Sequence, residues 1–186
     1  MLNKNVEVFM ACEKEAHEAD IVLFGAPFDS TTSYRPGTRF GSSAIRRESY
    51  GIECYSPYQD KDLEDTKVMD CGDLELCFGN TKKALAQIEE QAKEILDNSA
   101  IPFMLGGEHL VTLGAFRAVL EKYPDIHIIH FDAHADLREE YLGEQLSHAS
   151  VIRRCWDLVG DERIYQFGIR SGDREEFYWA KEHVTM

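Results

Sequence analysis

Short apolar runs alternate along the chain with segments in which apolar residues recur every three or four positions. The runs predict buried strands, because they are apolar without strict alternation. These strands are Ile21–Gly25, Lys67–Met69, Pro102–Leu105, Ile126–Phe131 and Ile164–Gly168. Helical spacing predicts helices at Thr81–Asp97, Leu110–Lys122, Ser147–Leu158 and Arg174–His183, with Thr81 as the N-cap of the first.

This alternation of strands and helices predicts an α/β fold. A mainly parallel sheet with helices on both faces has three layers, and residues 1–186 are expected to form one such domain. In sheets of this kind the ligand site lies outside the carboxyl ends of the strands. The residues that follow the predicted strands are therefore the first place to look for chemistry.

Two irregular segments lie between the predicted elements. Ala26–Ser43 is rich in Gly, Pro, Ser and Thr, which is typical of either a long loop near the strand ends or a structural turn. Arg138–Gln145 is strongly polar, which fits a solvated connection at least as well as a direct substrate contact.

The composition is that of a soluble globular domain, since 44% of the 186 residues are hydrophobic and 29% are charged. The formal net charge of −14 argues against nucleic acid or an anionic membrane surface as a partner. This charge also suits a cationic substrate, although the ordinary acidity of many soluble enzymes is the simpler explanation.

The cysteines indicate a reducing compartment. Five are present, an odd number without CxxC spacing, so we expect reduced thiols and neither a disulfide framework nor a zinc cluster. The N-terminal segment lacks an apolar core followed by a small-residue cleavage site, and no segment has the apolar length that spans a bilayer. The sequence therefore predicts a cytoplasmic protein without a membrane partner.

Candidate metal ligands are concentrated after the fourth predicted strand. The run Ile126–Arg138 (IHIIHFDAHADLR) places Asp132, His134 and Asp136 at every second position. In an extended chain, side chains at i, i+2 and i+4 point the same way, whereas in a helix His134 would lie nearly opposite the aspartates. The extended arrangement predicts a metal site at the carboxyl end of this strand.

A second metal-type pattern, FMLGGEH, ends at His109. Gly106 and Gly107 allow a sharp turn and a close backbone approach, which would deliver His109 from the end of a neighbouring strand. Two carboxylates and two imidazoles suit Mn²⁺, Fe²⁺, Co²⁺ or Zn²⁺ better than Ca²⁺, and the absence of thiolates from the motifs argues against structural zinc. Such a site supports metal-assisted hydrolysis, because divalent ions lower the pKa of water.

A purely structural alternative exists for these residues. In it, His109 and His134 are core histidines, and Asp132 and Asp136 cap a helix. The three-residue alternation combined with GGEH on a separate strand favours the metal site.

Three further residues each keep two interpretations. His148 fits a proton shuttle or substrate contact as well as a solvent-facing neighbour of a helix cap. His130 fits a hydrogen-bonded core residue better than a ligand. Glu108 is expected either to hold the tautomer of the adjacent imidazole or to cap the following helix.

Three motifs together resemble the ureohydrolase family of arginases and agmatinases: GGEHL (Gly106–Leu110), FDAHADLR (Phe131–Arg138) and SHAS (Ser147–Ser150). The likeness is greatest to the agmatinase branch. The early loop (Ala26–Arg46) and Tyr165–Phe177 match that branch too, so the resemblance runs along nearly the whole chain. It implies an arginase-like fold with three αβα layers.

The resemblance also implies an activity, the Mn²⁺-dependent hydrolysis of agmatine to putrescine and urea in polyamine biosynthesis. By this resemblance one Mn²⁺ is bound by His109, Asp132 and Asp136. Asp132 bridges to a second ion, which His134 also holds. A bridging hydroxide, hydrogen-bonded to Asp136, attacks the guanidinium carbon. His148 contacts the substrate and transfers a proton, so Asp136 and His148 are the implied catalytic residues.

A second family motif, SxDxDxxDP, supplies further aspartates to the metals in the family. Residues 1–186 do not contain it, so it is expected beyond Met186 together with the last strands of the sheet. A lone copy of this chain would then expose an open sheet edge. The resemblance further implies a homo-oligomer, trimeric or hexameric, with a small cationic guanidine compound as its substrate.

Other functions fit the same sequence. In the first, the chain is a truncated, non-catalytic subunit or assembly module without a working metal pair. In the second, the enzyme is a related guanidinobutyrase or formiminoglutamase. A deacetylase-like activity on acylated polyamines is more distant, because the pairing of GGEH with DAHAD is typical of ureohydrolases.

Overall fold

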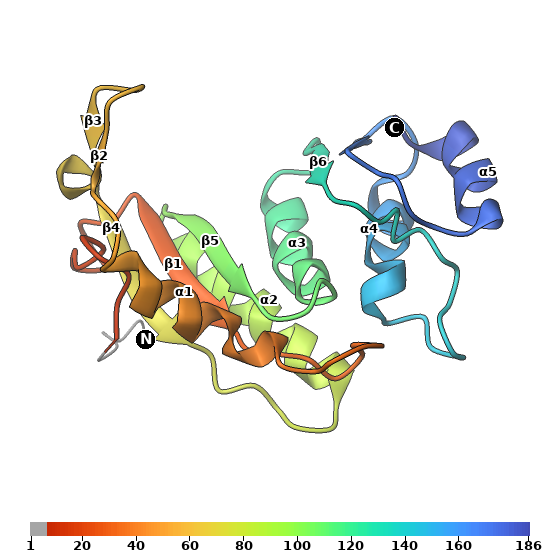
Figure 1. Ribbon diagram of the computed structural model, residues 1–186, viewed down its shortest axis with the longest axis horizontal. Helices are drawn as coiled ribbons and strands as arrows, with labels where there is room; N and C mark the ends of the chain where they lie inside the picture. The colour runs from red at the N-terminus through yellow and green to blue at the C-terminus, as the bar shows by residue number, and fades with distance from the viewer. Residues whose placement is uncertain (1–6) are drawn as a thin grey trace.

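The computed structural model describes residues 7–186, along which strands and helices alternate (Figure 1). The main strands are β1 (Ile21–Ala26), β4 (Val68–Asp73), β5 (Ile101–Gly106), β6 (Ile128–Phe131) and β7 (Ile164–Phe167). The α-helices are α1 (Gly41–Ser49), α2 (Thr81–Asp97), α3 (Val111–Lys122), α4 (Val151–Val159) and α5 (Arg174–His183). Between them lie a hairpin, β2 (Tyr55–Ser56) and β3 (Lys61–Asp62), and the 3₁₀ segments η1 (Thr38–Phe40), η2 (Leu63–Asp65) and η3 (His148–Ser150).

Each predicted strand and helix is present, and α2 and α5 have the predicted bounds. The N-cap prediction was wrong by one residue. The side chain of Asn80 accepts the Lys83 N–H at 2.9 Å, and Thr81 is already helical. Asn is the better cap of the two types, and it stands one position earlier. The predicted helix Ser147–Leu158 is divided into η3 and α4.

Helix α1 was not predicted, although it begins inside the segment expected to be a loop. Its buried side is polar, being made by Ser42, Arg46 and Ser49. A helix that buries polar side chains shows no apolar repeat, which is the signal on which the prediction depends.

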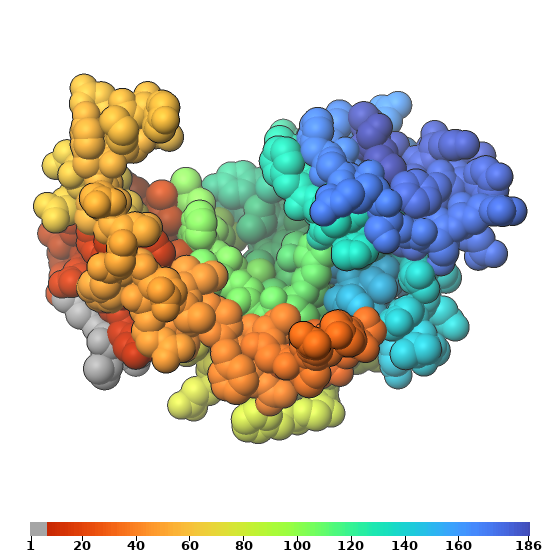
Figure 2. Space-filling model, in the orientation of Figure 1, coloured from red at the N-terminus to blue at the C-terminus, as the bar shows by residue number. Residues whose placement is uncertain are grey.

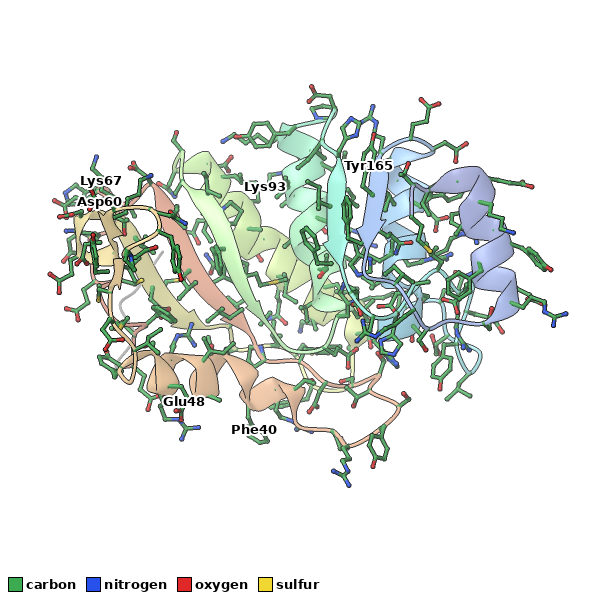
Figure 3. The ribbon with its side chains drawn as sticks, turned by 45° about the horizontal axis from the view of Figure 1, so that its top comes forward. Phe40, Glu48, Asp60, Lys67, Lys93 and Tyr165 are labelled. Carbon is green, nitrogen blue, oxygen red and sulfur yellow. The ribbon has the colours of Figure 1, made fainter. Side chains whose placement is uncertain are left out.

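Two parallel sheets carry the fold. Strands pair in the order β4–β1–β5 in the first sheet, and β6 pairs with β7 in the second. Helix α1 lies on one face of the first sheet, and α2 and α3 lie on the other (Figure 1). The arrowheads of β5 and β6 point to the same end of the molecule, which brings the segments that follow them together (Figure 3). This confirms the predicted α/β fold with parallel strands.

The core lies between the first sheet and its helix pair. Val22 and Phe24 of β1 are fully buried there, as are Leu85 and Ile88 of α2. A Cβ added to Gly114 of α3 would come within 2.7 Å of the Leu85 carbonyl oxygen, so the two helices approach closely at this glycine.

Several large apolar side chains of β5, β6 and β7 are exposed in the described residues. Ile101 and Phe103 on β5 are 63% and 54% exposed, and Ile129 and Phe131 on β6 are 65% and 78% exposed. The prediction that these strands are buried was wrong for these four side chains. Helix α1 contacts β5, but no helix of residues 7–186 covers these positions. No helix of residues 7–186 is long and apolar enough to cross a membrane.

Candidate metal centre

The segment after β5 delivers His109 to the carboxyl end of the sheet. A Cβ on Gly107 would lie 2.4 Å from the Ala26 carbonyl oxygen, so the chain passes the end of β1 too closely for any side chain here. The Gly107 and Glu108 N–H groups donate to the Ala26 and Phe28 carbonyls at 3.1 and 2.8 Å. The close approach predicted for the glycine pair is confirmed at Gly107.

Asp136 meets His109 from the segment after β6. Its Oδ2 atom lies 2.6 Å from Nδ1 of His109, and its backbone has a φ of +52°. That conformation is uncommon for a residue with a side chain. It is held because the Ile152 and Arg153 N–H groups, at the start of α4, donate to the Asp136 carbonyl at 3.1 and 3.2 Å.

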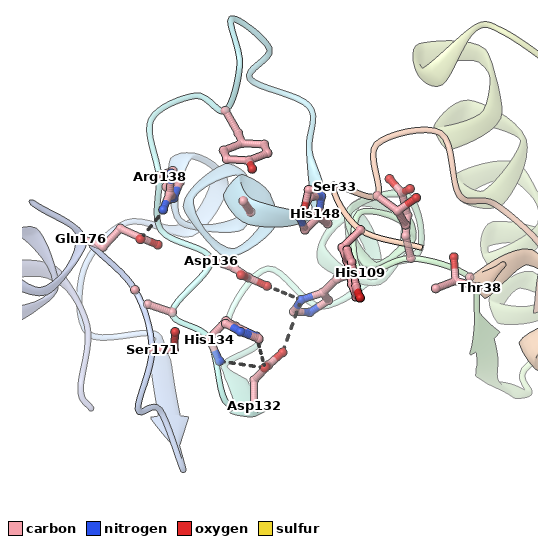
Figure 4. Close-up of a pocket in the computed structure, with 18 residues that line it drawn as sticks. Ser33, Thr38, His109, Asp132, His134, Asp136, Arg138, His148, Ser171 and Glu176 are labelled. Carbon is pink, nitrogen blue, oxygen red and sulfur yellow. Dashed lines mark hydrogen bonds and ion pairs between the residues drawn. The ribbon is translucent and has the colours of Figure 1, made fainter. Parts of the chain in front are cut away.

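Asp132 approaches the same nitrogen of His109 as Asp136 does. Its Oδ2 lies 3.6 Å from Nδ1 of His109, and its Oδ1 accepts the His134 N–H at 2.9 Å (Figure 4). Burial acts to raise the pKa of Asp132. The His134 N–H, the nearby His109 and the hydrogen bond from His130 outweigh it, so that the pKa lies below its ordinary value.

His130 is buried beside this carboxylate, with Nε2 3.2 Å from Oδ2 of Asp132. Desolvation lowers the pKa of His130, His109 adds to the effect, and the two aspartates oppose it. His109, His130, Asp132 and Asp136 each offer an atom within 4.8 Å of the others, close enough to hold one ion. The prediction of His130 as a hydrogen-bonded, buried residue is confirmed, but its position inside this cluster was not foreseen.

His134 does not join these four residues. Its side chain is 65% exposed, and Nδ1 lies 3.6 Å from Oδ1 of Asp132. The expected extended alternation ends early, because β6 stops at Phe131 and Asp136 turns into the left-handed region. Asp132 and Asp136 therefore converge through a turn and not along a strand, while His134 stays on the outer side of Asp132.

A cavity of about 670 Å³ opens in front of the cluster, and its lining includes Tyr34, Arg138, Tyr141 and Glu176 (Figure 4). Figure 2 shows how it is bounded: the loop after β1, in orange, reaches across to the cyan segment after β6. The segment expected to be a solvated connection thus contributes Arg138 and Tyr141 to the wall.

His148 lies on the wall of this cavity, at the start of η3. Its N–H donates to the Thr31 hydroxyl at 3.0 Å, and Nε2 lies 3.4 Å from the Ser33 hydroxyl. The ring of Tyr141 packs edge-on against it, with centroids 5.6 Å apart. The imidazole Nδ1 also lies 3.4 Å from the Thr31 hydroxyl. His148 is half-buried and directly follows Ser147, the N-cap of η3, so it is a neighbour of a helix cap whose ring lines the cavity.

Glu108 has neither of its expected roles. Its buried carboxylate accepts the Thr31 N–H at 2.8 Å and also the Thr31 hydroxyl. Helix α3 has no side-chain N-cap. Glu108 instead ties the loop after β1 to the end of β5 and, through Thr31, supports His148.

Glu176 and Thr31 were not found by sequence reasoning. Glu176 is buried and accepts the Leu137 N–H at 3.0 Å, which anchors the residue after Asp136. A signal existed, since Asp173 and Glu176 have capping-box spacing and do form that box on α5. No comparable pattern marks Thr31, whose partners are more than 70 residues away.

The chain matches known proteins along most of its length. The family model described as the arginase family matches residues 19–186. An agmatinase of Bacillus anthracis is 52% identical over 176 residues, which are 95% of this chain and 61% of that protein. A guanidinobutyrase of Pseudomonas aeruginosa is 34% identical over 173 residues, 90% of this chain and 54% of that protein.

A solved structure of a related protein also resembles this chain. The crystal structure of the agmatine ureohydrolase of Thermoplasma volcanium superposes with a TM-score of 0.90 at 35% identity, covering 97% of this chain and 61% of that one. This chain therefore spans about three-fifths of the length of the relatives that it matches.

Proposed function

The chain belongs to the arginase family, and we propose that its site hydrolyses the guanidinium group of agmatine, giving urea and putrescine, with Mn²⁺ as the cofactor. The observation that carries the proposal is the convergence of His109 from the end of β5 with Asp132 and Asp136 from the end of β6. The similarity to proteins named agmatinase supports the choice of substrate.

The donor set fits a divalent ion such as Mn²⁺. It combines imidazole nitrogen with carboxylate oxygen, contains no thiolate, and gathers its atoms within 4.8 Å. When bound, such an ion supplies Lewis-acid chemistry, because it lowers the pKa of water by several units. His109, Asp132 and Asp136 would hold it, and His134, on the outer side of Asp132, would face a second ion.

The protein's own groups supply the proton transfers. Asp136 is positioned to accept a proton from the attacking water, because it offers an atom to the cluster and its Oδ2 lies 2.6 Å from Nδ1 of His109. His148, across the cavity, is positioned to contact the substrate and to protonate the departing amine. Removing proton transfer by one positioned side chain typically costs on the order of 10²–10⁴ in rate.

The lining of the cavity favours a cationic substrate over an anionic one. Asp132, Asp136 and Glu176 line it, and its arginine, Arg138, already lies 3.4 Å from Glu176. Agmatine carries a second positive charge, whereas guanidinobutyrate carries a carboxylate that finds no free cationic side chain in this lining, because Arg138 is paired with Glu176. We therefore place agmatine ahead of guanidinobutyrate.

A urea-release assay with added Mn²⁺ tests the proposal. Agmatine, arginine and guanidinobutyrate are compared, and agmatine is expected to give the most urea. The variant His109→Asn should abolish release, while His127→Asn, a matched change at the ring stacked on Tyr165, should preserve it. If none of the three compounds yields urea with the wild-type chain or with a full-length version of it, ureohydrolase activity is excluded.

A non-catalytic scaffold is the second candidate, favoured by the exposed position of His134 outside the cluster. Counting bound Mn²⁺ per chain by equilibrium dialysis separates the two functions. Two tightly bound ions per chain would rule out the scaffold, whereas one ion or none, without turnover, would support it.

We further propose that the protein is a cytoplasmic homo-oligomer, trimeric or hexameric, and that residues 1–186 fold as one domain. Sedimentation equilibrium of the purified chain measures the assembly directly, and a monomer at micromolar concentration would contradict it.

A further inference from the structure

A buried pair of side chains, Gln166 and His130, lies directly behind the metal cluster. The two residues are register partners on β7 and β6, and they are only 2% and 6% exposed. Nε2 of Gln166 lies 2.8 Å from Nδ1 of His130 and 2.8 Å from the carbonyl oxygen of Ala135. Which atom donates in each of these hydrogen bonds determines which ring nitrogen of His130 carries the proton.

The amide orientation of Gln166 is fixed by Ala135. A carbonyl oxygen only accepts, so the amide atom facing Ala135 must be the donor nitrogen. The reverse orientation would place two oxygens face to face. Oε1 of Gln166 is buried without a hydrogen-bond partner among the described residues, so the two donors of this side chain are used at the expense of its acceptor.

The second N–H of Gln166 then sets the tautomer of His130. Because Nδ1 accepts this hydrogen bond, the neutral imidazole carries its proton on Nε2. That proton points at Oδ2 of Asp132, 3.2 Å away. A protonated nitrogen has no lone pair for a metal, and Nδ1 is already occupied, so His130 is not a ligand although it lies among the ligand atoms.

We propose that Gln166, acting through His130, is a positioning residue that orients the Asp132 carboxylate for the metal. Oδ2 is held by His130, and Oδ1 is held by the His134 N–H at 2.9 Å. The carboxylate plane is thus fixed from both sides before an ion arrives. The consequence for catalysis rests on the proposed function, whereas the tautomer itself does not.

The test reads the tautomer in the metal-free chain. Long-range ¹H–¹⁵N spectra of protein labelled with ¹⁵N-histidine are recorded at pH 8.5, and His130 is assigned by its loss in His130→Asn. The Nε2–H tautomer is expected for the wild type. Gln166→Met keeps the volume but removes both donors, and a rise in the Nδ1–H form is expected. Gln91→Met, a matched change on α2, should leave the spectrum unchanged.

A wild-type His130 in the Nδ1–H form would overturn the proposal without any variant, so the result does not depend on how Gln166→Met folds. An unchanged tautomer in a folded Gln166→Met protein would overturn it too.

Metal titration provides a second readout that separates positioning from ligation. With Zn²⁺, which is diamagnetic, the His130 Nε2–H signal should persist, and its replacement by a coordination shift would show a ligand and refute the proposal. Gln166→Met should weaken Zn²⁺ binding by about tenfold, as loss of a group that supports a ligand usually does. If Zn²⁺ does not bind at all, the proposed metal function fails while the tautomer result stands.

Discussion

At the scale of single residues, the buried guanidinium of Arg46 joins a helix to a strand through two carboxylates. Arg46 is 1% exposed, and its Nε and Nη2 atoms donate to Asp70 at 2.7 and 3.0 Å, while Nη1 pairs with Asp73. Asp70 also accepts the Gly72 N–H at 2.9 Å. These contacts fasten α1 to β4.

The variant Arg46→Met is expected to destabilise the protein by about 3–5 kcal/mol, because it leaves the Asp70 carboxylate buried without its cationic partner. Urea unfolding followed by circular dichroism measures the change. The neighbouring exposed Arg47→Met serves as the control and should stay within about 0.5 kcal/mol of the wild type. A small effect at Arg46 would mean that water reaches Asp70.

Sequence patterns identify residues of this site only where the signal is local. His109, Asp132 and Asp136 were found because they stand in short motifs at strand ends. Gln166 was not found, since its role depends on facing His130 across two strands 36 residues apart. Register of that kind is decided by tertiary packing, which no short motif records.

At the scale of elements, α3 packs closely against α2. A Cβ on Gly114 would lie 2.7 Å from the Leu85 carbonyl oxygen and 2.9 Å from the Ile88 Cβ atom. Both neighbours belong to a helix that cannot yield locally. Glycine is therefore required here by space, against its poor helix propensity.

The variant Gly114→Ala is expected to lose about 1–3 kcal/mol of stability, because the added methyl group pushes the two helices apart. Thermal and urea unfolding measure the loss. Gly106→Ala is the control, since its Cβ would meet only the Val111 Cγ2 atom at an ordinary 3.5 Å. A more stable Gly114→Ala protein would show that α3 can shift freely.

Helix α5 is fastened at its end by a pH-sensitive contact. Asp161 Oδ1 lies 2.8 Å from Nδ1 of His183 and accepts the Trp156 indole N–H at 2.9 Å. The hydrogen bonds from His183 and then Trp156 lower the pKa of Asp161 from its ordinary 3.8. A carboxyl group with a lowered pKa in the folded state adds stability above its unfolded pKa and loses it as pH falls toward the folded value.

Stability should therefore fall between about pH 5 and pH 3 more steeply in the wild type than in Asp161→Asn, whose side chain does not titrate. Tryptophan fluorescence during urea unfolding at each pH measures this difference. Asp125→Asn, an exposed change elsewhere, should follow the wild-type curve. Parallel curves for Asp161→Asn and wild type would show that the contact does not persist in solution.

Elements, like residues, could be predicted from the sequence only where the signal is local. The bounds of α2 and α5 follow from apolar spacing and from capping residues directly beside the helices, Asn80 and Asp173. Helix α1 escaped prediction because its stability comes from Arg46 and other polar contacts with the strands. Local pattern is a sufficient guide only where an element buries an apolar face.

At the scale of the whole molecule, the open sheet edges are the main feature. One open edge was expected from the family resemblance. Among the described residues, β5 and β6 are both unpaired on one side, whereas the outer sides of β4 and β7 carry single bridges to Glu13 and Thr185. Sequence cannot reveal this arrangement, since strand order depends on segments packing in space. The Thermoplasma volcanium structure superposes on 97% of this chain with a TM-score of 0.90, so both sheets lie within the matched part.

The hydrogen bonds within each sheet show which backbone N–H groups lie on these open edges. On β5 the Ile101 N–H donates to Asp20 at 2.9 Å and the Gly107 N–H to Ala26 at 3.1 Å, so odd-numbered residues face β1. Successive N–H groups alternate in direction along a strand. The Met104 N–H therefore points to the open side.

The same alternation applies on β6. The Ile128 N–H donates to the Arg163 carbonyl at 2.8 Å, and the Asp132 N–H donates to the Phe167 carbonyl at 3.1 Å. The N–H groups of Ile129 and Phe131 therefore lie on the open side. Hydrogen exchange of the isolated chain, followed by NMR, should therefore show fast exchange at Ile129, Phe131 and Met104. Slow exchange is expected at the alternating positions His130 and Phe103, whose N–H groups lie inside the ladders. Equal protection of both sets would contradict open edges and would mean that another strand, from a second copy or from elsewhere in the protein, pairs with them.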